Sequence, residues 1–161
     1  MGFATEKEAY ALLEELAISY QRFDHPAITS AQDLKFSLPG QQVKNILLKS
    51  KTGHRYYLVI LPIQKQAHLS ELANSLGEKR LSFASTQELE DLLHVPAGTV
   101  TPFGLMFDQD RKVKVILDTE LDSHLPLGFH PFSNATTLNI AYADVEKVLE
   151  KLGHKPQYLT C

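Results

Sequence analysis

A lysine stands inside an otherwise apolar stretch of the chain. Lys44 lies in the run Val43–Leu48, in which every other residue except Asn45 is aliphatic. Removing an ammonium group from water is costly unless the group is paired or takes part in binding or catalysis. From the residues alone two interpretations stay open: a lysine whose long side chain reaches solvent at a strand edge, and a cation that positions a substrate.

A second unusual stretch is Gly98–Leu105, which contains two glycines, two threonines and a proline. These residues cannot continue a helix and pair poorly in a central strand, so they predict a shaped loop. Glycine allows the backbone to approach a ligand closely, and successive N–H groups in a loop can meet developing negative charge. The alternative is an ordinary bent connection, which composition alone favours.

The chain has seven histidines, but they form no recognisable metal motif. No HxH or HExxH pair occurs, and the single cysteine, Cys161, is the last residue, so we expect no metal site and no thiolate chemistry. The serine-nucleophile, phosphate-loop and dinucleotide signatures are absent as well. The sequence therefore predicts neither a metal nor a cofactor.

Length and composition are those of one globular domain that spans residues 1–161, with 43% hydrophobic and 22% charged residues. No apolar run is long enough to cross a bilayer, and the acidic, amphipathic start is not typical of a signal peptide, so we expect a cytoplasmic protein. The net charge of −3 argues against a protein that coats nucleic acid. Local cations around Lys44–Arg55 and at Lys79–Arg80 could still meet a few phosphates.

Periodicity and turn residues divide the chain into short helices and strands. Thr5 and Glu8 form a capping box at the start of a helix that extends to about Ile18. The elements expected next are a strand over Ser19–Asp24, a short helix over Ala31–Ser37, a hairpin of Val43–Lys49 with Tyr56–Leu61, a helix over His68–Leu76, a strand over Arg80–Phe83 and a helix over Thr86–Leu93.

In the remainder of the chain we expect a hairpin of Leu105–Phe107 with Lys112–Leu117, a loop over Leu127–Phe132, a strand over Thr136–Ile140, a helix over Tyr142–Leu152 and an edge strand over Pro156–Leu159. Hairpins and interspersed helices favour a mixed, largely antiparallel sheet over a doubly wound parallel one. The predicted fold class is α/β, with a sheet curled toward a barrel and surrounded by helices.

Four segments together resemble one family in the same order along the chain. They are Lys44–Leu48, Arg80–Ala84, Gly98–Leu105, and Gly128–Pro131 with Asn134. The chain is similar, from about Tyr10 to Tyr158, to free-standing prolyl-tRNA-editing-domain proteins, which are related to the insertion domain of bacterial prolyl-tRNA synthetases. Its nearest resemblance is to the branch that hydrolyses alanine attached to proline tRNA.

The resemblance implies roles for individual residues. It assigns the essential lysine of the family to Lys44 and its glycine-x-x-x-proline loop to Gly98, Thr99, Val100, Thr101 and Pro102. The other tRNA and pocket positions that it implies are Tyr20, Asn45, Arg80 and His130, with Asn134 in the last motif. For His130, composition alone leaves a pocket wall and a core histidine equally open.

The implied reaction is hydrolysis of the ester between an amino acid and the terminal ribose of tRNA. Backbone N–H groups of the Gly98 loop would stabilise the oxyanion, and Lys44 would hold the terminal phosphate or ribose hydroxyl while a water attacks. Such a mechanism needs no protein nucleophile. The implied partners are the acceptor end of mischarged proline tRNA and prolyl-tRNA synthetase.

A synthetase pocket built for proline cannot strongly exclude the smaller alanine, whereas a second, smaller pocket can reject proline. His130 with Phe103, Leu105 and Phe129 are candidates to line that pocket, although the three apolar residues could simply form core. Two rival functions stay open: a cysteinyl-tRNA deacylase of the same fold, and a noncatalytic module that binds the tRNA acceptor end.

Overall fold

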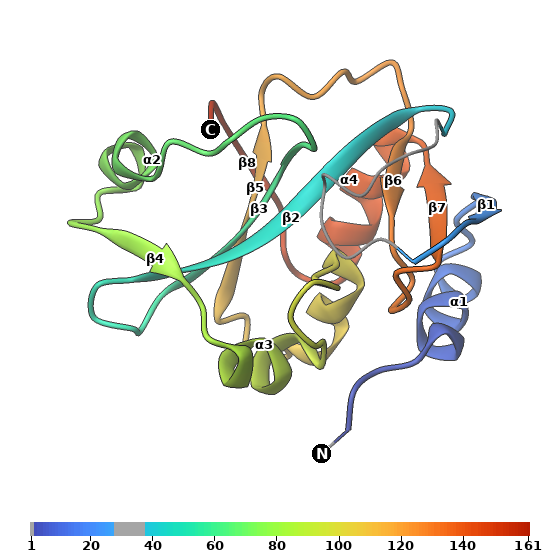
Figure 1. The fold of residues 1–161 in the computed structure, drawn as a ribbon, viewed down its shortest axis with the longest axis horizontal. Coiled ribbons are helices and arrows are strands. Elements are labelled where there is room, and N and C mark those ends of the chain that lie inside the picture. Colours follow the sequence, from blue (N-terminus) through green and yellow to red (C-terminus); the bar gives the residue numbers. More distant parts are fainter. Residues whose placement is uncertain (1, 28–37) are drawn as a thin grey trace.

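A curled mixed sheet with helices on its faces organises the chain (Figure 1). The computed structural model describes residues 2–27 and 38–161, and the helix expected over 31–37 lies outside the described residues. The described strands are β1 (Gln21–Asp24), β2 (Gln41–Ser50), β3 (Tyr56–Pro62), β4 (Leu81–Phe83), β5 (Val113–Asp118), β6 (Leu127–Phe129), β7 (Thr136–Ile140) and β8 (Gln157–Leu159). The helices are α1 (Glu6–Glu15), α2 (Leu69–Leu76), α3 (Thr86–Leu93), α4 (Tyr142–Lys151) and a 3₁₀ helix, η2 (Pro102–Phe107).

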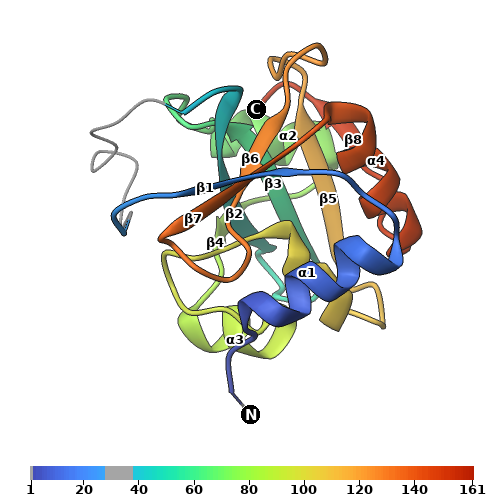
Figure 2. The ribbon, with the colours of Figure 1, turned by 90° about the vertical axis from the view of Figure 1, so that its right-hand side faces the viewer.

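The strands lie in the order β1-β7-β6-β2-β3-β5-β8, and β4 pairs with β2 beside this path. Among the described strands four pairings are antiparallel and three, β2–β6, β3–β5 and β5–β8, are parallel. Figure 2 shows how strongly the sheet curls, with α1 and α4 on one side. The predicted α/β class with a curled mixed sheet is confirmed, and the sheet is not closed into a barrel.

Local signals place most of the elements where the sequence predicts them. Glu8 accepts the Thr5 N–H at the start of α1, as expected for a capping box. Gly77 ends α2 in the left-handed conformation, with φ of 72°. The hairpin of β2 and β3 pairs in register from Val43 opposite Pro62 to Lys49 opposite Tyr56. These elements are encoded by neighbouring residues, so their prediction succeeded.

The expected hairpin of Leu105–Phe107 with Lys112–Leu117 is wrong. Leu105–Phe107 belongs to η2, and β5 pairs in parallel with β3 on one side and with β8 on the other. The buried Asp108 carboxylate accepts the N–H groups of Lys112 and Val113, which fixes a turn between η2 and β5. A short apolar run does not by itself distinguish a strand from a buried helical turn.

The expected loop over Leu127–Phe132 is also partly wrong, because Leu127–Phe129 forms strand β6. Gly128 makes this possible: a Cβ there would lie 2.8 Å from the Thr137 side chain and 3.0 Å from Asn139 Oδ1. The close approach of β7 therefore requires a glycine in the middle of the strand. Only the pairing of distant strands shows that this glycine belongs to a sheet.

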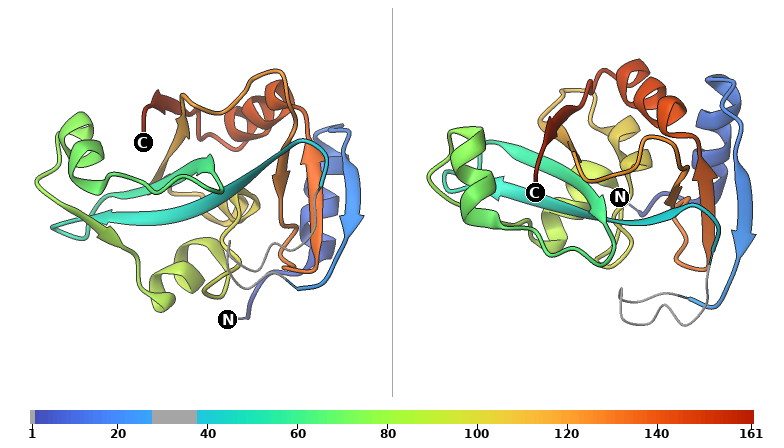
Figure 3. Two further views of the ribbon diagram at one scale, coloured as in Figure 1. Left: turned by 45° about the horizontal axis from the view of Figure 1, so that its top comes forward. Right: turned by 90° about the horizontal axis from the view of Figure 1, so that it is seen from above.

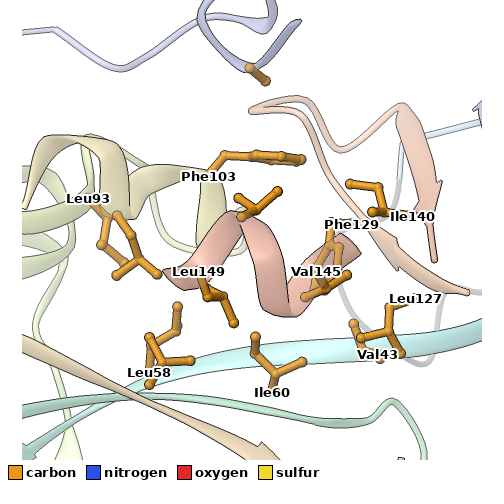
Figure 4. Close-up of a cluster of buried hydrophobic side chains, with 14 of the residues drawn as sticks. Val43, Leu58, Ile60, Leu93, Phe103, Leu127, Phe129, Ile140, Val145 and Leu149 are labelled. Atoms are coloured by element: carbon orange, nitrogen blue, oxygen red, sulfur yellow. The ribbon is translucent and has the colours of Figure 1, made fainter. Parts of the chain in front are cut away.

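Two groups of apolar side chains lie on opposite faces of the sheet. The main core fills the concave face, where α1, α4 and η2 pack (Figure 4). The outer cluster, beneath α2, consists of Leu48, Tyr57, Val59, Leu61, Leu72, Ala73, Leu81, Ile116 and Cys161. Along β2, side chains alternate between these two groups.

None of the helices among residues 2–27 and 38–161 has the length and apolarity needed to cross a membrane.

Candidate active site

The segment from Gly98 to Phe107 is a loop that turns into a 3₁₀ helix. Gly98 adopts φ of 87°, a left-handed conformation that favours glycine, and Pro102 begins η2, where its missing N–H costs nothing. Gly104 lies so close to the end of α3 that a Cβ would be 2.6 Å from the Leu93 carbonyl oxygen. The predicted loop is therefore correct for Gly98–Thr101 and wrong for the residues from Pro102 onward.

The loop presents backbone donors that the fold does not use. Within the described part of the chain, the N–H groups of Gly98, Val100 and Thr101 donate to no protein acceptor, whereas Thr99 N–H donates to the Pro96 carbonyl at 3.3 Å. Thr101 is fully buried, and its Oγ1 also has no hydrogen-bond partner. Gly98 is exposed and Val100 is half-buried, so their N–H groups can donate to water or to a ligand, whereas an unpaired donor at the buried Thr101 is rare.

The side chains of Lys44 and its neighbour Asn45 lie on opposite faces of β2. Lys44 lies opposite Leu61, which belongs to the outer cluster, and Asn45 lies opposite Ile60 in the main core. Among the described residues no carboxylate pairs with the half-buried Lys44 ammonium group. Asn45 Oδ1 is buried and has no hydrogen-bond partner. The two predicted site residues can therefore not contact one ligand from the same side of the strand.

β2 and β6 are paired over a short stretch only, and the pairing ends before Lys44 and His130 are reached. β2 and β6 pair in parallel only at Gln41 with Leu127 and Gln42 with Gly128. Counted on from that register, Lys44 and His130 each lie two residues beyond the last paired position, and alternation assigns them to the same face of the sheet. Figure 3 shows β2 running away from β6 and β7 beyond this point. Lys44 and His130 thus lie just beyond the paired part of β2 and β6.

His130 is held in one tautomer. Its Nδ1 lies 3.1 Å from the Thr136 carbonyl oxygen, which can only accept, so Nδ1 carries the proton and Nε2 of the neutral ring is an acceptor. Burial lowers the pKa of His130 below the usual histidine value, although the bond to Thr136 opposes the shift. The His25 ring lies edge-on to His130, with 6.3 Å between ring centroids. The ring therefore favours the neutral form.

Aromatic rings fix η2 beneath the connection between β6 and β7. Phe103 lies 6.4 Å from Phe129 and 6.3 Å from Phe132, and Phe107 lies 6.1 Å from Phe132, between ring centroids. Phe132 adopts φ of 62°, an unusual conformation for a bulky residue. The connection, which also carries the half-buried Asn134, is thereby held against η2. The Phe103 and Phe129 side chains are core residues.

Two predicted site residues, Tyr20 and Arg80, lie away from Lys44. Tyr20 precedes β1, three strand spacings from β2 or about 14 Å, and lines a pocket of about 440 Å³ together with Tyr142. Arg80 precedes β4, whose Leu81 lies opposite Ser50 at the far end of β2, roughly 20 Å from Lys44. Tyr20 and Arg80 therefore lie far from Lys44.

The sequence reasoning missed Glu88, which connects α3 to the sheet. Its carboxylate accepts hydrogen bonds from Lys49 Nζ at 2.8 Å, the Ser85 N–H at 2.9 Å and the Tyr56 hydroxyl at 2.6 Å. Burial pushes the pKa of the Glu88 carboxyl up, but these bonds together lower it to about 2. The Ser85–Glu88 spacing is a capping-box signal that could have identified this residue.

Neither metal nor thiolate chemistry is suggested by the described residues. No group of three or more histidine, cysteine, aspartate or glutamate side chains in residues 2–27 and 38–161 could hold a metal ion. His154 and Asp108 form the most enclosed pair, 3.6 Å apart, and lie behind the turn between η2 and β5. The groups that the described part of the chain offers include the backbone donors of the Gly98 loop, Lys44 and the His130 imidazole.

Comparison with known proteins shows which proteins this chain is similar to. Residues 25–148 match the model of the aminoacyl-tRNA editing domain. The chain is 29% identical over 157 residues to the prolyl-tRNA editing protein ProX of Acetoanaerobium sticklandii, covering 96% of each chain. It is 28% identical over 122 residues to the multifunctional Ser/Thr-tRNA deacylase ProXp-y of Escherichia coli K12, covering 73% of this chain and 71% of that one.

A solved structure has the same fold. It is described as a candidate trans-editing enzyme for prolyl tRNA synthetase, with a TM-score of 0.70 and 18% identity over 97% of this chain and 96% of the other.

Proposed function

Because the chain belongs to the aminoacyl-tRNA editing domain family, we propose that it hydrolyses alanine from mischarged proline tRNA in trans. The family assignment made from the four sequence motifs is confirmed, and relatives are named as editing proteins and deacylases. The proposal is carried by the backbone donors of Gly98, Val100 and Thr101, which no protein acceptor uses, and by Lys44, which has no carboxylate partner among the described residues.

In the proposed reaction a water attacks the ester carbonyl carbon and forms a tetrahedral intermediate. Negative charge then develops on the carbonyl oxygen, and N–H groups of the Gly98 loop stabilise it, each good donor contributing about 3 kcal/mol. Collapse of the intermediate breaks the bond to the ribose oxygen. One proton of the water goes to that oxygen, the other is released to solvent, and the amino acid leaves as a carboxylate.

Lys44 has a positioning role in this proposal. It lies on the outer face of β2, whereas the residues that follow the Gly98 loop pack in the main core, so the ester would enter between the separating strands from the Lys44 side. The Lys44 ammonium group would hold the terminal phosphate or a ribose hydroxyl, and the hydroxyl would orient the attacking water. No protein nucleophile is needed.

His130 and the aromatic residues around η2 would select the amino acid. The neutral ring offers Nε2 as an acceptor, a suitable partner for the ammonium group of an aminoacyl ester. Phe103 and Phe129 narrow the space beneath it. A small pocket of this kind would admit alanine and reject proline by its size. We expect replacement of His130 by alanine to change amino-acid selectivity more than stability.

Steady-state hydrolysis by the purified protein tests the proposal. The substrates are alanyl-, cysteinyl-, seryl-, threonyl- and prolyl-tRNA, all prepared on proline tRNA. We expect the highest kcat/KM for the alanyl ester and little turnover of the prolyl ester. A preference for cysteine, serine or threonine would replace the proposed substrate but keep the reaction. Binding without turnover of any ester would show that the chain is a noncatalytic tRNA module.

Prolyl-tRNA synthetase is a proposed partner, supported by the description of the related solved structure. If the synthetase delivers mischarged tRNA, adding it to the assay should raise the rate of deacylation at limiting tRNA. A rate that is independent of the synthetase would limit the partners to tRNA alone.

A further inference from the structure

The most exposed large hydrophobic side chain of the described residues lies on the same face of the sheet as Lys44. Phe83 is 61% exposed, and it lies opposite Leu48 in the β2–β4 ladder. Lys44, Ile46 and Leu48 alternate with the residues of β2 that face the main core, so Phe83 shares the outer face with them, although Leu48 itself is fully buried in the outer cluster. A single exposed aromatic side chain is common on protein surfaces, and its meaning depends on what lies around it.

The position of Phe83 relative to Lys44 is set by two paired strands. Four residues of β2 separate Lys44 from Leu48, a distance of about 13 Å, and Phe83 lies one strand spacing further, at about 5 Å. A few nucleotides of single-stranded RNA can span this distance. The hydrogen bond from Ala84 N–H to the Leu47 carbonyl, at 2.9 Å, keeps β4 against β2 at this point.

Cations lie at both ends of the stretch from Lys44 to Phe83 and beyond it. Lys44 is unpaired at one end, and the exposed Lys79 and Arg80 lie just before β4 at the other. The nearby cations Lys49 and Arg55 are different, because each is paired with a glutamate. An aromatic side chain between cations, along a strand, is the arrangement by which proteins bind single-stranded nucleic acid without reading its sequence.

We propose that Phe83 is a stacking platform for a base in the single-stranded acceptor end of tRNA, upstream of the nucleotide that carries the amino acid. The inference rests on the proposed function, which places the ester near Lys44. The base stacks on the exposed ring, and Lys79 and Arg80 meet phosphates on its 5′ side, further from the amino acid. This platform accounts for an exposed aromatic residue that neither the core nor the chemical step uses.

The absence of tryptophan from the chain provides a direct test. In Phe83→Trp the new side chain is the only tryptophan, and stacking of a base on it quenches its fluorescence. The probe is a single-stranded RNA tetranucleotide of sequence ACCA. The matched control is Tyr158→Trp, which places a tryptophan at a position 47% exposed on the edge strand β8. We expect saturable quenching of the first variant and none of the second.

Kinetics provides a second test that separates stacking from a structural role. Phe83→Ala should raise KM for alanyl-tRNA about tenfold and change kcat less than twofold, and Phe83→Trp should restore KM. With alanyl-adenosine as the substrate, which lacks the upstream bases, KM should differ much less between Phe83→Ala and the unaltered protein.

Each outcome decides between the alternatives. Equal quenching of both tryptophans, or a KM that Phe83→Ala leaves unaltered, would overturn the inference. Fluorescence that depends on protein concentration and not on RNA would show that Phe83 contacts a second protein molecule. If no aminoacyl-tRNA is hydrolysed but RNA still quenches the tryptophan at position 83, the proposed reaction fails and the RNA platform stands.

Discussion

Two lysines on the same strand, Lys44 and Lys49, have different surroundings. Lys49 faces α3, and its ammonium group lies 2.8 Å from Glu88 Oε1. Lys44 lies five residues earlier, on the other face of β2, and has no carboxylate partner among the described residues. The difference separates a cation that the fold uses to hold a helix from one that is available to a substrate. A lysine in an apolar strand is therefore not by itself a functional signal.

The largest expected effect comes from removing the unpaired cation. Lys44→Ala should lower kcat/KM for deacylation about 100-fold or more, because positioning of the ester is lost, and should leave the melting temperature within about 2 °C. The matched control is Lys51→Ala, at an exposed lysine in the turn after β2, which should retain activity. Full activity of Lys44→Ala in steady-state assays would remove the functional distinction between the two lysines.

The next largest effect should follow from replacing the partner of the other lysine. Glu88→Gln loses a charged acceptor for Lys49, Tyr56 and the Ser85 N–H, and should lower the free energy of unfolding by about 1–3 kcal/mol. Because α3 leads into the Gly98 loop, kcat should fall more than KM rises. Denaturant unfolding and steady-state kinetics measure the two effects. An unaltered kcat in a destabilised protein would mean that α3 does not position the loop.

Lys49→Ala should have a smaller effect, about 0.5–1 kcal/mol in denaturant unfolding, because the ion pair is partly exposed to solvent. Its kcat/KM per folded molecule should stay within threefold of the unaltered protein. A loss of activity as large as that of Lys44→Ala would contradict the assignment of Lys49 to structure.

As the pH falls, the contribution of Glu88 to the free energy of unfolding should decrease gradually. The folded-state pKa of Glu88 is lowered to about 2 from the ordinary value of 4.5, so its contribution to stability is complete above pH 4.5 and is lost as the pH falls toward 2. The stability difference between the unaltered protein and Glu88→Gln should therefore shrink over this range. A difference that stays constant down to pH 2.5 in pH-dependent unfolding would show that the carboxyl is not stabilised by its partners.

Much of the fold could be predicted because its signals are local. The capping box at Thr5, the glycine that ends α2 and the alternating strands of the hairpin each depend on residues within a few positions of one another. The family, too, could be identified from short motifs, and the match over residues 25–148 confirms it. The roles of Lys44, the Gly98 loop and His130 stay predictions that the experiments above test.

The sequence by itself determined which residues could do chemistry: the lysine in a strand, the glycine-rich loop and the histidine after Gly128. Only the tertiary structure decided which of them share a face. The parallel register of β2 with β6 assigns Lys44 and His130 to the same face, and the alternation along β2 separates Lys44 from Asn45. The physical reason is that strand pairing and charge pairing join residues far apart in the chain, where no local pattern can specify the partner.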